Sequence, residues 1–266
     1  MDEQTIIEQA TRAKWETLRP SFLAWAAESG VSPSEFDRIV EGQVEFARVE
    51  YQKERAAKEL SHSLTTWDEV TPEESASLRA LLDTNPDEAS MHHFLEENPK
   101  FLVQALAAGH GRYQLSKKRL GSQYVPDFLV AEESSMGIEW YAVEIESPRS
   151  KEHRRDGNPA QALTTALAQI RDWREWLMNN LDYARRSKEQ DGLGLMGIDS
   201  RIPGLILIGR RHNYPVRFNN FRRQISDRER ILIHSYDWLI DVARGNTSGW
   251  LRAGLSRVKE RIGVSP

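Results

Sequence analysis

The sequence has no cysteine among its 266 residues, which excludes disulfides, thiol catalysis and cysteine-ligated zinc. No run approaches the roughly 18 apolar residues that a membrane-spanning helix needs, and the acidic start MDEQTIIEQ is unlike a signal peptide. The seven histidines lack metal-ligand spacing such as HExxH. We therefore expect a cytoplasmic protein without a membrane segment, in which any metal is a hard ion held by oxygen ligands.

Charge is distributed unevenly along a chain whose overall composition is typical of a folded protein, with 39% hydrophobic and 29% charged residues. Residues 1–90 hold 9 basic and 19 acidic side chains, a net charge of −10. The remaining 176 residues hold 27 basic and 21 acidic side chains, a net charge of +6, within an overall charge of −4. The basic part of the chain suits a polyanionic partner such as DNA.

The first 75 residues are predicted to form an acidic helical module. In 33–61 the apolar residues recur mostly three or four positions apart, which predicts an amphipathic helix, and 3–29 is also predicted to be helical. The polar stretch 61–75 is predicted to be a linker, although TPEE at 71–74 has a capping-box pattern that can begin another helix. The module could regulate the rest of the chain or form a helical hairpin used for dimerisation.

Residues 86–266 are predicted to form a second, mixed α/β domain. The runs RYQLSKKRL, YVPDFLVA and IEWYAVEIES are typical of a three-stranded antiparallel meander. Later strands are expected at 203–210 and in RILIHS. One helix is expected to end at Glu97, and a short second helix is expected to begin with Asn98 as its cap and to stop at Gly109. Further helices are expected over 159–190, 219–229, 235–244 and 249–261.

Three carboxylates are predicted to converge at the end of the meander. In Val143-Glu144-Ile145-Glu146 the period of two places both glutamates on one face of the strand, and Asp127 can reach that face from the preceding strand. Carboxylates brought together raise the pKa of at least one of them, and a divalent cation removes that cost. An ordinary polar strand face shows the same alternation, so the spacing leaves both interpretations open.

The order FLEENP, YVPDFLV, VEIESP and ALAQIRDWREWL resembles the PD-(D/E)XK nuclease superfamily and, within it, the SduA effector domain of Shedu anti-phage defence nucleases. The likeness covers about residues 88–245 and includes LILIGR and SYDWLI. It implies a restriction-endonuclease-like core, in which helices flank a mixed sheet. It also implies cleavage of DNA phosphodiesters that depends on Mg²⁺ or Mn²⁺.

The resemblance implies that Asp127 and Glu144 are metal ligands and that Gln169 is a helical glutamine that contacts the scissile region or the catalytic strand. Glu146 stands where the family usually has lysine. A carboxylate there cannot donate positive charge, but it can act as a general base or bind a second metal.

Other candidates lie on neighbouring elements. Lys117 or Lys118, on the strand before Asp127, could bring a cation to the site or bind DNA, or could simply face solvent. Glu96 or Glu97 could supply the additional acid that many members of the superfamily place on their first core helix.

A basic segment follows the catalytic strand and is well placed for contacts with phosphates. Its cationic candidates are Arg149, Lys151, His153, Arg154 and Arg155. Trp173 and Trp176 could stack on bases, but their helical spacing among apolar neighbours favours a place in the core.

Three functions are compatible with these patterns. The first is a metal-dependent DNA endonuclease of bacterial antiviral defence, which we expect to form homo-oligomers. The second is a nuclease fold that has lost its lysine and serves as a nucleic-acid sensor. The third is a structural partner protein assembled through its acidic helices.

Overall fold

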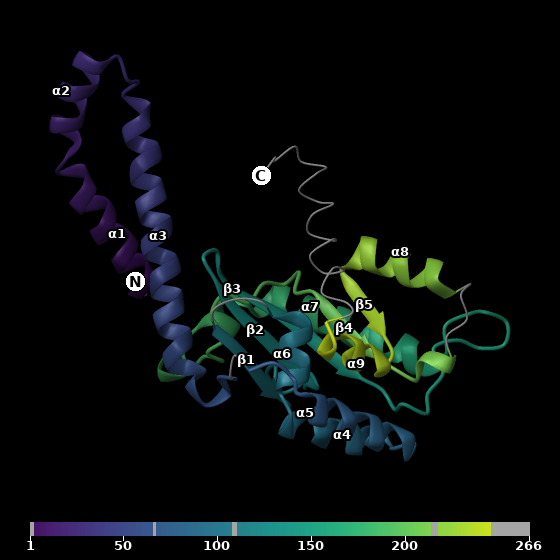
Figure 1. The fold of residues 1–266 in the computed structure, drawn as a ribbon. Coiled ribbons are helices and arrows are strands. Elements are labelled where there is room, and N and C mark those ends of the chain that lie inside the picture. Colours follow the sequence, from purple (N-terminus) through teal and green to yellow (C-terminus); the bar gives the residue numbers. More distant parts are fainter. Residues whose placement is uncertain (1–2, 66–67, 108–110, 214–217, 246–266) are drawn as a thin grey trace.

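The computed structural model describes residues 3–65, 68–107, 111–213 and 218–245. The chain has an α/β core in which helices flank a five-stranded mixed sheet, and a long pair of helical arms projects from one side of that core (Figure 1). None of the helices in these four ranges is both long enough and apolar enough to cross a membrane.

The sheet has the strand order β1-β2-β3-β4-β5. Its strands are β1 Gly111–Ser116, β2 Phe128–Ser134, β3 Gly137–Ile145, β4 Gly204–Leu207 and β5 Ile231–His234. Strands β1, β2 and β3 pair antiparallel, as the alternating sequence predicts, whereas β3, β4 and β5 pair in parallel. Strand β3 is therefore central, with an antiparallel neighbour on one side and a parallel one on the other.

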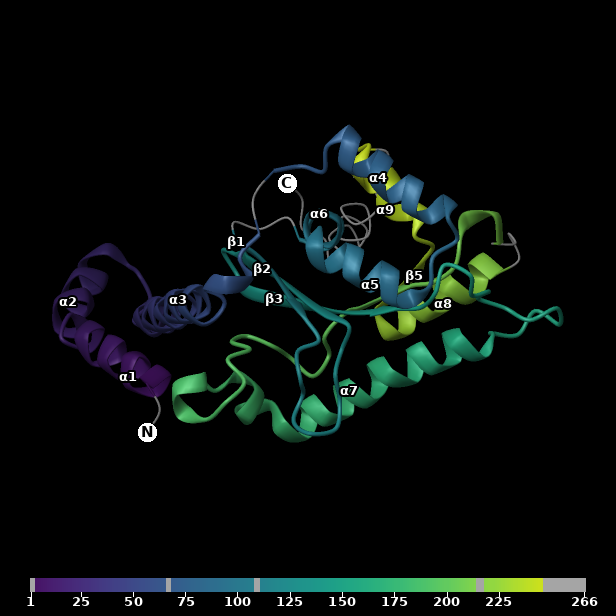
Figure 2. The same ribbon diagram turned by 90° about the horizontal axis from the view of Figure 1, so that it is seen from below.

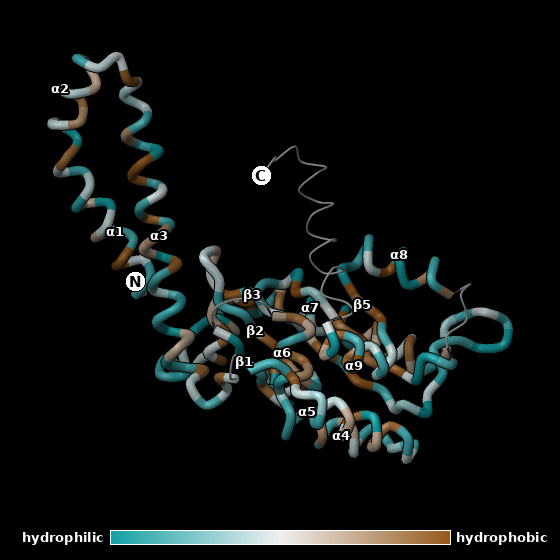
Figure 3. The backbone as a smooth tube through the Cα atoms, viewed as in Figure 1, coloured by the Kyte–Doolittle hydropathy of each residue, from teal (hydrophilic) through white to brown (hydrophobic). Residues whose placement is uncertain are grey.

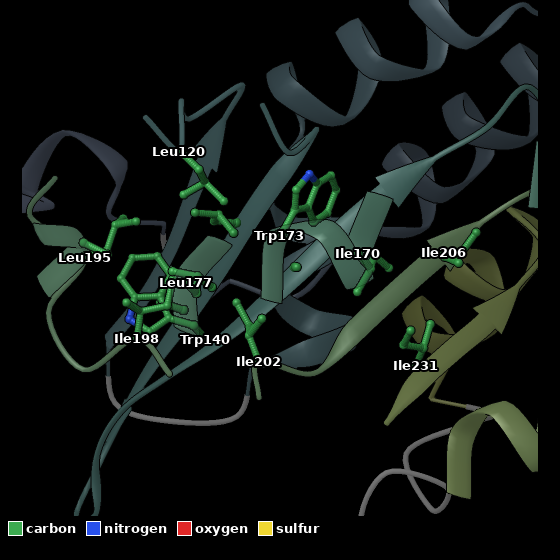
Figure 4. Close-up of a cluster of buried hydrophobic side chains, with 14 of the residues drawn as sticks. Leu120, Trp140, Ile170, Trp173, Leu177, Leu195, Ile198, Ile202, Ile206 and Ile231 are labelled. Atoms are coloured by element: carbon green, nitrogen blue, oxygen red, sulfur yellow. The ribbon is translucent and has the colours of Figure 1, made fainter. Parts of the chain in front are cut away.

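Two layers of helices cover the sheet. Strand β3 is followed by α7 (Gln161–Arg185), which packs with α8 (Asn219–Glu229) over one face, and Figure 4 shows the buried side chains between α7 and the strands. The other face carries α4 (Pro72–Asp83), α5 (Glu88–Glu97), α6 (Lys100–Leu106) and α9 (Asp237–Ala243). Figure 2 shows α5 and α7 on opposite sides of the sheet.

Close approach of α7 to β4 depends on Gly204. A Cβ added there would lie 2.9 Å from the Cδ1 atom of Ile170 on α7 and 3.2 Å from the Ile231 side chain, so a larger residue would require these side chains to repack. Helix α7 kinks at Asn180, which has non-helical dihedral angles. It ends at Arg185 and is followed by the short turn η2 (Lys188–Gln190), so the helix predicted over 159–190 is shorter than expected.

The N-terminal arms comprise α1 (Glu3–Glu16), α2 (Arg19–Ser29) and α3 (Ser34–Glu59). The prediction of one helix over 3–29 is wrong, because the chain turns at 17–18 and Pro20 begins a separate helix in its first turn. Near its end α3 enters the core, where Ala56 and the following Leu60 are buried among the α7-side residues. The arms are thus anchored to the sheet at the foot of α3.

The remaining predicted elements are found with small shifts. The capping box at Thr71 and Glu74 begins α4, so part of the predicted linker is helical. Asn98 was expected to cap α6, but its side-chain amide donates instead to the Phe94 carbonyl at the end of α5. Short 3₁₀ turns are η1 (Ser61–Ser63) and η3 (Arg211–Asn213). The predicted stop at Gly109 and the helix at 249–261 lie outside the described residues.

Candidate metal and nucleic-acid site

The candidate site lies at the start of β2 and the end of β3. Val143 and Ile145 face the helices α4, α5, α6 and α9, while Ala142 packs on the α7 side. Alternation therefore directs Glu144 and Glu146 toward the α7 side, as the sequence predicts. Asp127, just before β2, meets the same strand end, since its Oδ2 accepts a hydrogen bond of 2.9 Å from the Ile145 backbone N–H.

Asp127 is held by three further groups. Its side chain is buried, and Oδ1 forms an ion pair with the Lys117 ammonium. The Lys117 backbone N–H donates a hydrogen bond of 2.9 Å to the Asp127 carbonyl. The same carbonyl lies 3.4 Å from the Nε2 atom of His92 on α5. These contacts fix both the backbone and the carboxylate of Asp127.

Glu144 is 5% exposed and has a buried oxygen, Oε2, without a hydrogen-bond partner in the described part of the chain. Burial, together with the charges of Asp127 and Glu146, raises the pKa of Glu144 to about 9, and Lys117 opposes this increase. A buried carboxylate oxygen with no donor is a costly feature that a proton or a cation would satisfy.

Glu146 follows on the same face and is half-buried. The pKa of Glu146 is raised to about 7, mainly by burial and then by the charges of Glu88 and Asp127. Its backbone is fixed by two hydrogen bonds. Its N–H donates one of 2.8 Å to the Leu207 carbonyl, and its carbonyl accepts one of 2.9 Å from the Tyr236 hydroxyl.

Glu88 is a fourth acid that our sequence analysis missed. It lies in the first turn of α5 with an exposed side chain, and desolvation by the surrounding residues followed by the charge of Asp127 raises its pKa. Glu96 and Glu97, predicted for this role, are exposed at the other end of the helix. A helical period of 3.6 aligns Glu88 with the buried residues Met91 and Leu95, so periodicity could have identified it.

Two other residues near the carboxylates were also missed. His92 follows Glu88 by one helical turn and stacks on Phe128, with ring centroids 4.6 Å apart. Tyr236 is fully buried, and burial followed by the charges of Asp127 and Glu88 raises its pKa. Tyr236 comes from the segment between β5 and α9, a long-range neighbour that local sequence patterns do not reveal.

Both candidate lysines lie beyond the end of β1 and not on the strand, where the sequence predicts them, and the structure separates them. Lys117 contacts Asp127, whereas the half-buried Lys118 interacts electrostatically with Lys188 and Glu59 at the foot of α3. Burial and Lys188 lower the pKa of Lys118. Of the two, only Lys117 is brought to the carboxylates.

Gln169 is half-buried on α7, and no hydrogen bond joins it to Asp127, Glu144 or Glu146. Trp173 is buried in the α7-side core, and Trp176 packs partly buried against that core with its indole beside Gly121. The structure thus confirms core positions for both tryptophans.

The basic segment forms the hydrophilic loop between β3 and α7 (Figure 3). Buried Glu152 anchors it to α8 through a bidentate ion pair with Arg222 at 2.9 and 3.2 Å. His153 is half-buried against Phe218. The exposed cationic side chains of this loop are Arg149, Lys151, Arg154 and Arg155.

Arg149 lies next to a surface hollow of about 520 Å³ that also contains Arg210 and His212. The Nε–H group of Arg149 donates a hydrogen bond of 2.7 Å to the Asn85 carbonyl. Arg210 is engaged by Asp237 and by the Leu82 carbonyl. Arg149 is therefore oriented on the rim of this hollow by the loop that precedes α5.

The carboxylates of the candidate site suit a hard divalent cation that takes only a few of its ligands from the protein. No group of three or more acidic or histidine side chains in the described ranges is close enough to enclose an ion. Mg²⁺ commonly uses one or two carboxylates and completes its shell with water and substrate phosphates. The orphaned oxygen of Glu144 and the adjacent Asp127 provide two such carboxylates.

Comparison with known proteins places this site within a family. No curated protein matches the chain. The family described as Shedu protein SduA, C-terminal, matches residues 85–240, which include all four carboxylates, Lys117 and Tyr236. Since this match covers more than half of the chain, the protein belongs to the Shedu SduA family.

Proposed function

We propose that this chain is a metal-dependent DNA endonuclease of the PD-(D/E)XK type that acts in bacterial anti-phage defence in the cytoplasm. The observation that carries the proposal is the convergence of Asp127, Glu144 and Glu146 at one strand end, with an unpartnered oxygen on buried Glu144. Membership of the Shedu SduA family supports the role in defence.

In this proposal Asp127 and Glu144 hold the cation, which is Mg²⁺ or Mn²⁺. When bound at these two carboxylates, such an ion would supply Lewis acidity to a phosphoryl oxygen and would lower the pKa of a water. Asp127 is oriented by the Ile145 N–H and Lys117, so its free lone pairs have a fixed direction. Glu146 accepts the proton of the attacking water, and a pKa of about 7 suits a general base that works near neutral pH.

DNA would approach along the loop between β3 and α7. Arg149, Lys151, Arg154 and Arg155 are exposed there and contact phosphates, which supply much of the affinity for DNA that is independent of sequence. Gln169 would contact the scissile region from α7. Glu152, paired with Arg222, holds the loop against the core so that these cations stay near the strand end.

The N-terminal arms would associate with those of a second copy. Their own buried cluster is small: it comprises Phe36, Val40 and Val44, with Trp15 and Phe22 packed partly buried against it. Large apolar side chains remain exposed along the arms: Ile6, Leu18, Leu23, Trp25, Ile39 and Phe46. Exposed apolar residues grouped on projecting helices are typical of a protein–protein interface.

A second candidate function is nucleic-acid binding without cleavage. The absence of lysine at 146 favours it, since the residue that usually offsets transition-state charge in the superfamily is replaced by Glu146. The basic loop would bind DNA equally well in such a protein.

A cleavage assay on linear, circular and single-stranded DNA over a series of divalent metals tests the proposal. We expect cleavage with Mg²⁺ or Mn²⁺ by the wild type, and none by Asp127→Asn or Glu144→Gln at equal DNA binding. Glu146→Ala should cleave far more slowly, and Glu139→Gln, an exposed position on the same strand, should match the wild type. DNA binding with no cleavage under any metal would favour the second function.

A further inference from the structure

The carboxylate cluster at the end of β3 is contacted by a lysine, Lys117, that does not belong to β3. Lys117 forms an ion pair with Asp127 at the strand end where Glu144 and Glu146 also lie, and its charge opposes the rise in the pKa of both Glu144 and Glu88. Four acids and one lysine thus share the end of β3.

The side chain of Lys117 reaches its partner from outside the catalytic strand. Strand β1 ends at Ser116, and Lys117 follows directly. Its ammonium pairs with the carboxylate of Asp127, whose side chain is 6% exposed, while about half of the lysine side chain remains in solvent. The lysine therefore spans from the surface to the buried carboxylate.

The backbone of Lys117 is also specialised. Its φ of +48° lies in the left-handed region, which residues with a Cβ rarely adopt. This conformation turns the chain out of β1 and directs the Lys117 N–H to the Asp127 carbonyl at 2.9 Å. Glycine or asparagine would adopt such a turn with less strain, so the presence of lysine points to a use for its side chain.

From these contacts we propose that Lys117 takes over the charge-compensating role of the lysine that Glu146 replaces, acting on the cluster from the turn after β1 instead of from β3. This inference rests on the proposed metal-dependent nuclease function. Lys117 is a positioning residue: it fixes the direction of the Asp127 carboxylate, and it limits the negative charge at the place where a cation and a phosphate must meet.

Metal affinity measured without DNA separates this role from a general structural one. We compare Lys117→Met with Lys118→Met, its neighbour at the foot of α3, by calorimetric titration with Mn²⁺. Removing a cation beside Asp127 should tighten Mn²⁺ binding about tenfold by the Coulomb attraction gained. Lys118→Met should bind Mn²⁺ as the wild type does. Equal affinity of Lys117→Met and wild type would overturn the inference.

The rate of DNA cleavage is the second readout, measured for Lys117→Met and for a double variant that moves the positive charge to position 146. At saturating Mn²⁺, Lys117→Met should cleave DNA about 100-fold more slowly than the wild type, a loss comparable to that of one electrostatic contact in other active sites. The double variant Lys117→Met with Glu146→Lys returns the cation to the usual strand and should regain most of this rate. A double variant as slow as Lys117→Met would contradict the proposed equivalence of the two positions.

The two proposals fail in different ways. If the wild type binds Mn²⁺ but cleaves no DNA, the nuclease function fails and the calorimetric comparison alone decides whether Lys117 acts on the cluster. If the wild type cleaves and Lys117→Met cleaves equally fast, the nuclease function stands and the role of Lys117 is refuted. If Mn²⁺ binds neither protein, both proposals are wrong.

Discussion

Replacing Glu144 by glutamine should make the metal-free protein more stable. The buried carboxyl has an unpartnered Oε2 and a pKa of about 9, so at pH 7 it stays protonated in the folded state and ionises on unfolding. Glutamine has almost the same shape but avoids this protonation cost. The variant would therefore exchange metal binding for stability, as is common at functional sites.

The size of the effect follows from the difference between pH 7 and the ordinary pKa of 4.5. At about 1.36 kcal/mol per pH unit, holding the proton costs about 3 kcal/mol. Burying the amide of glutamine also costs free energy, so we expect a net gain of about 1–2 kcal/mol at pH 7.

The gain should depend on pH in a defined direction. The pKa of Glu144 is raised in the folded state, so folded wild type holds more protons than unfolded wild type between pH 4.5 and about pH 9. Its stability therefore rises as the pH falls through this range, and the advantage of Glu144→Gln shrinks. At pH 5 the advantage should be below about 1 kcal/mol.

Urea denaturation with a chelator present, at pH 5 and pH 7, measures this difference. Glu139→Gln, an exposed position on the same strand, is the matched control and should have little effect at either pH. A Glu144→Gln variant that is less stable than wild type at pH 7, or equally stabilised at both pH values, would refute the account of Glu144 as a buried, protonated carboxyl.

Three further predictions concern other parts of the molecule. Glu88→Gln should weaken Mn²⁺ binding in a calorimetric titration, whereas Glu96→Gln, two turns further along the same helix, should not; equal effects would exclude Glu88 from the site. Trp25→Ser should shift the chain to a smaller mass in light scattering, and an unchanged mass would show that the arms do not join copies. Thr71→Ala removes a capping box and should lower the free energy of unfolding by about 1 kcal/mol in urea titrations, while a loss within error would mean that α4 is fixed by packing alone.

Local patterns predicted how the three central carboxylates of the candidate site are arranged. Strand alternation placed Glu144 and Glu146 on one face, and the antiparallel meander brought Asp127 to the same strand end. These relations depend on neighbours along one strand or across one hairpin, so the sequence contains them directly.

Longer-range parts of the site were not predictable in the same way. Tyr236 reaches Glu146 only because β5 lies two strands from β3, a relation that no local period encodes. Lys117 and Lys118 look alike in the sequence, and the left-handed turn at Lys117 decides which one meets Asp127. The break before α2 had a local signal in Pro20, which suits the first turn of a helix and which the prediction of one helix over 3–29 did not use.

The central position of β3 determines when the candidate site can be completed during synthesis. The carboxylates of Glu88, Asp127, Glu144 and Glu146 all leave the ribosome before β4, the strand that binds β3 on its parallel side. Chains fold progressively during synthesis, so a nascent chain that ends before Gly204 has the acids but lacks the strand and the tyrosine that fix Glu146. Under the proposed nuclease function, the site would therefore be completed only after β4 and Tyr236 have been translated.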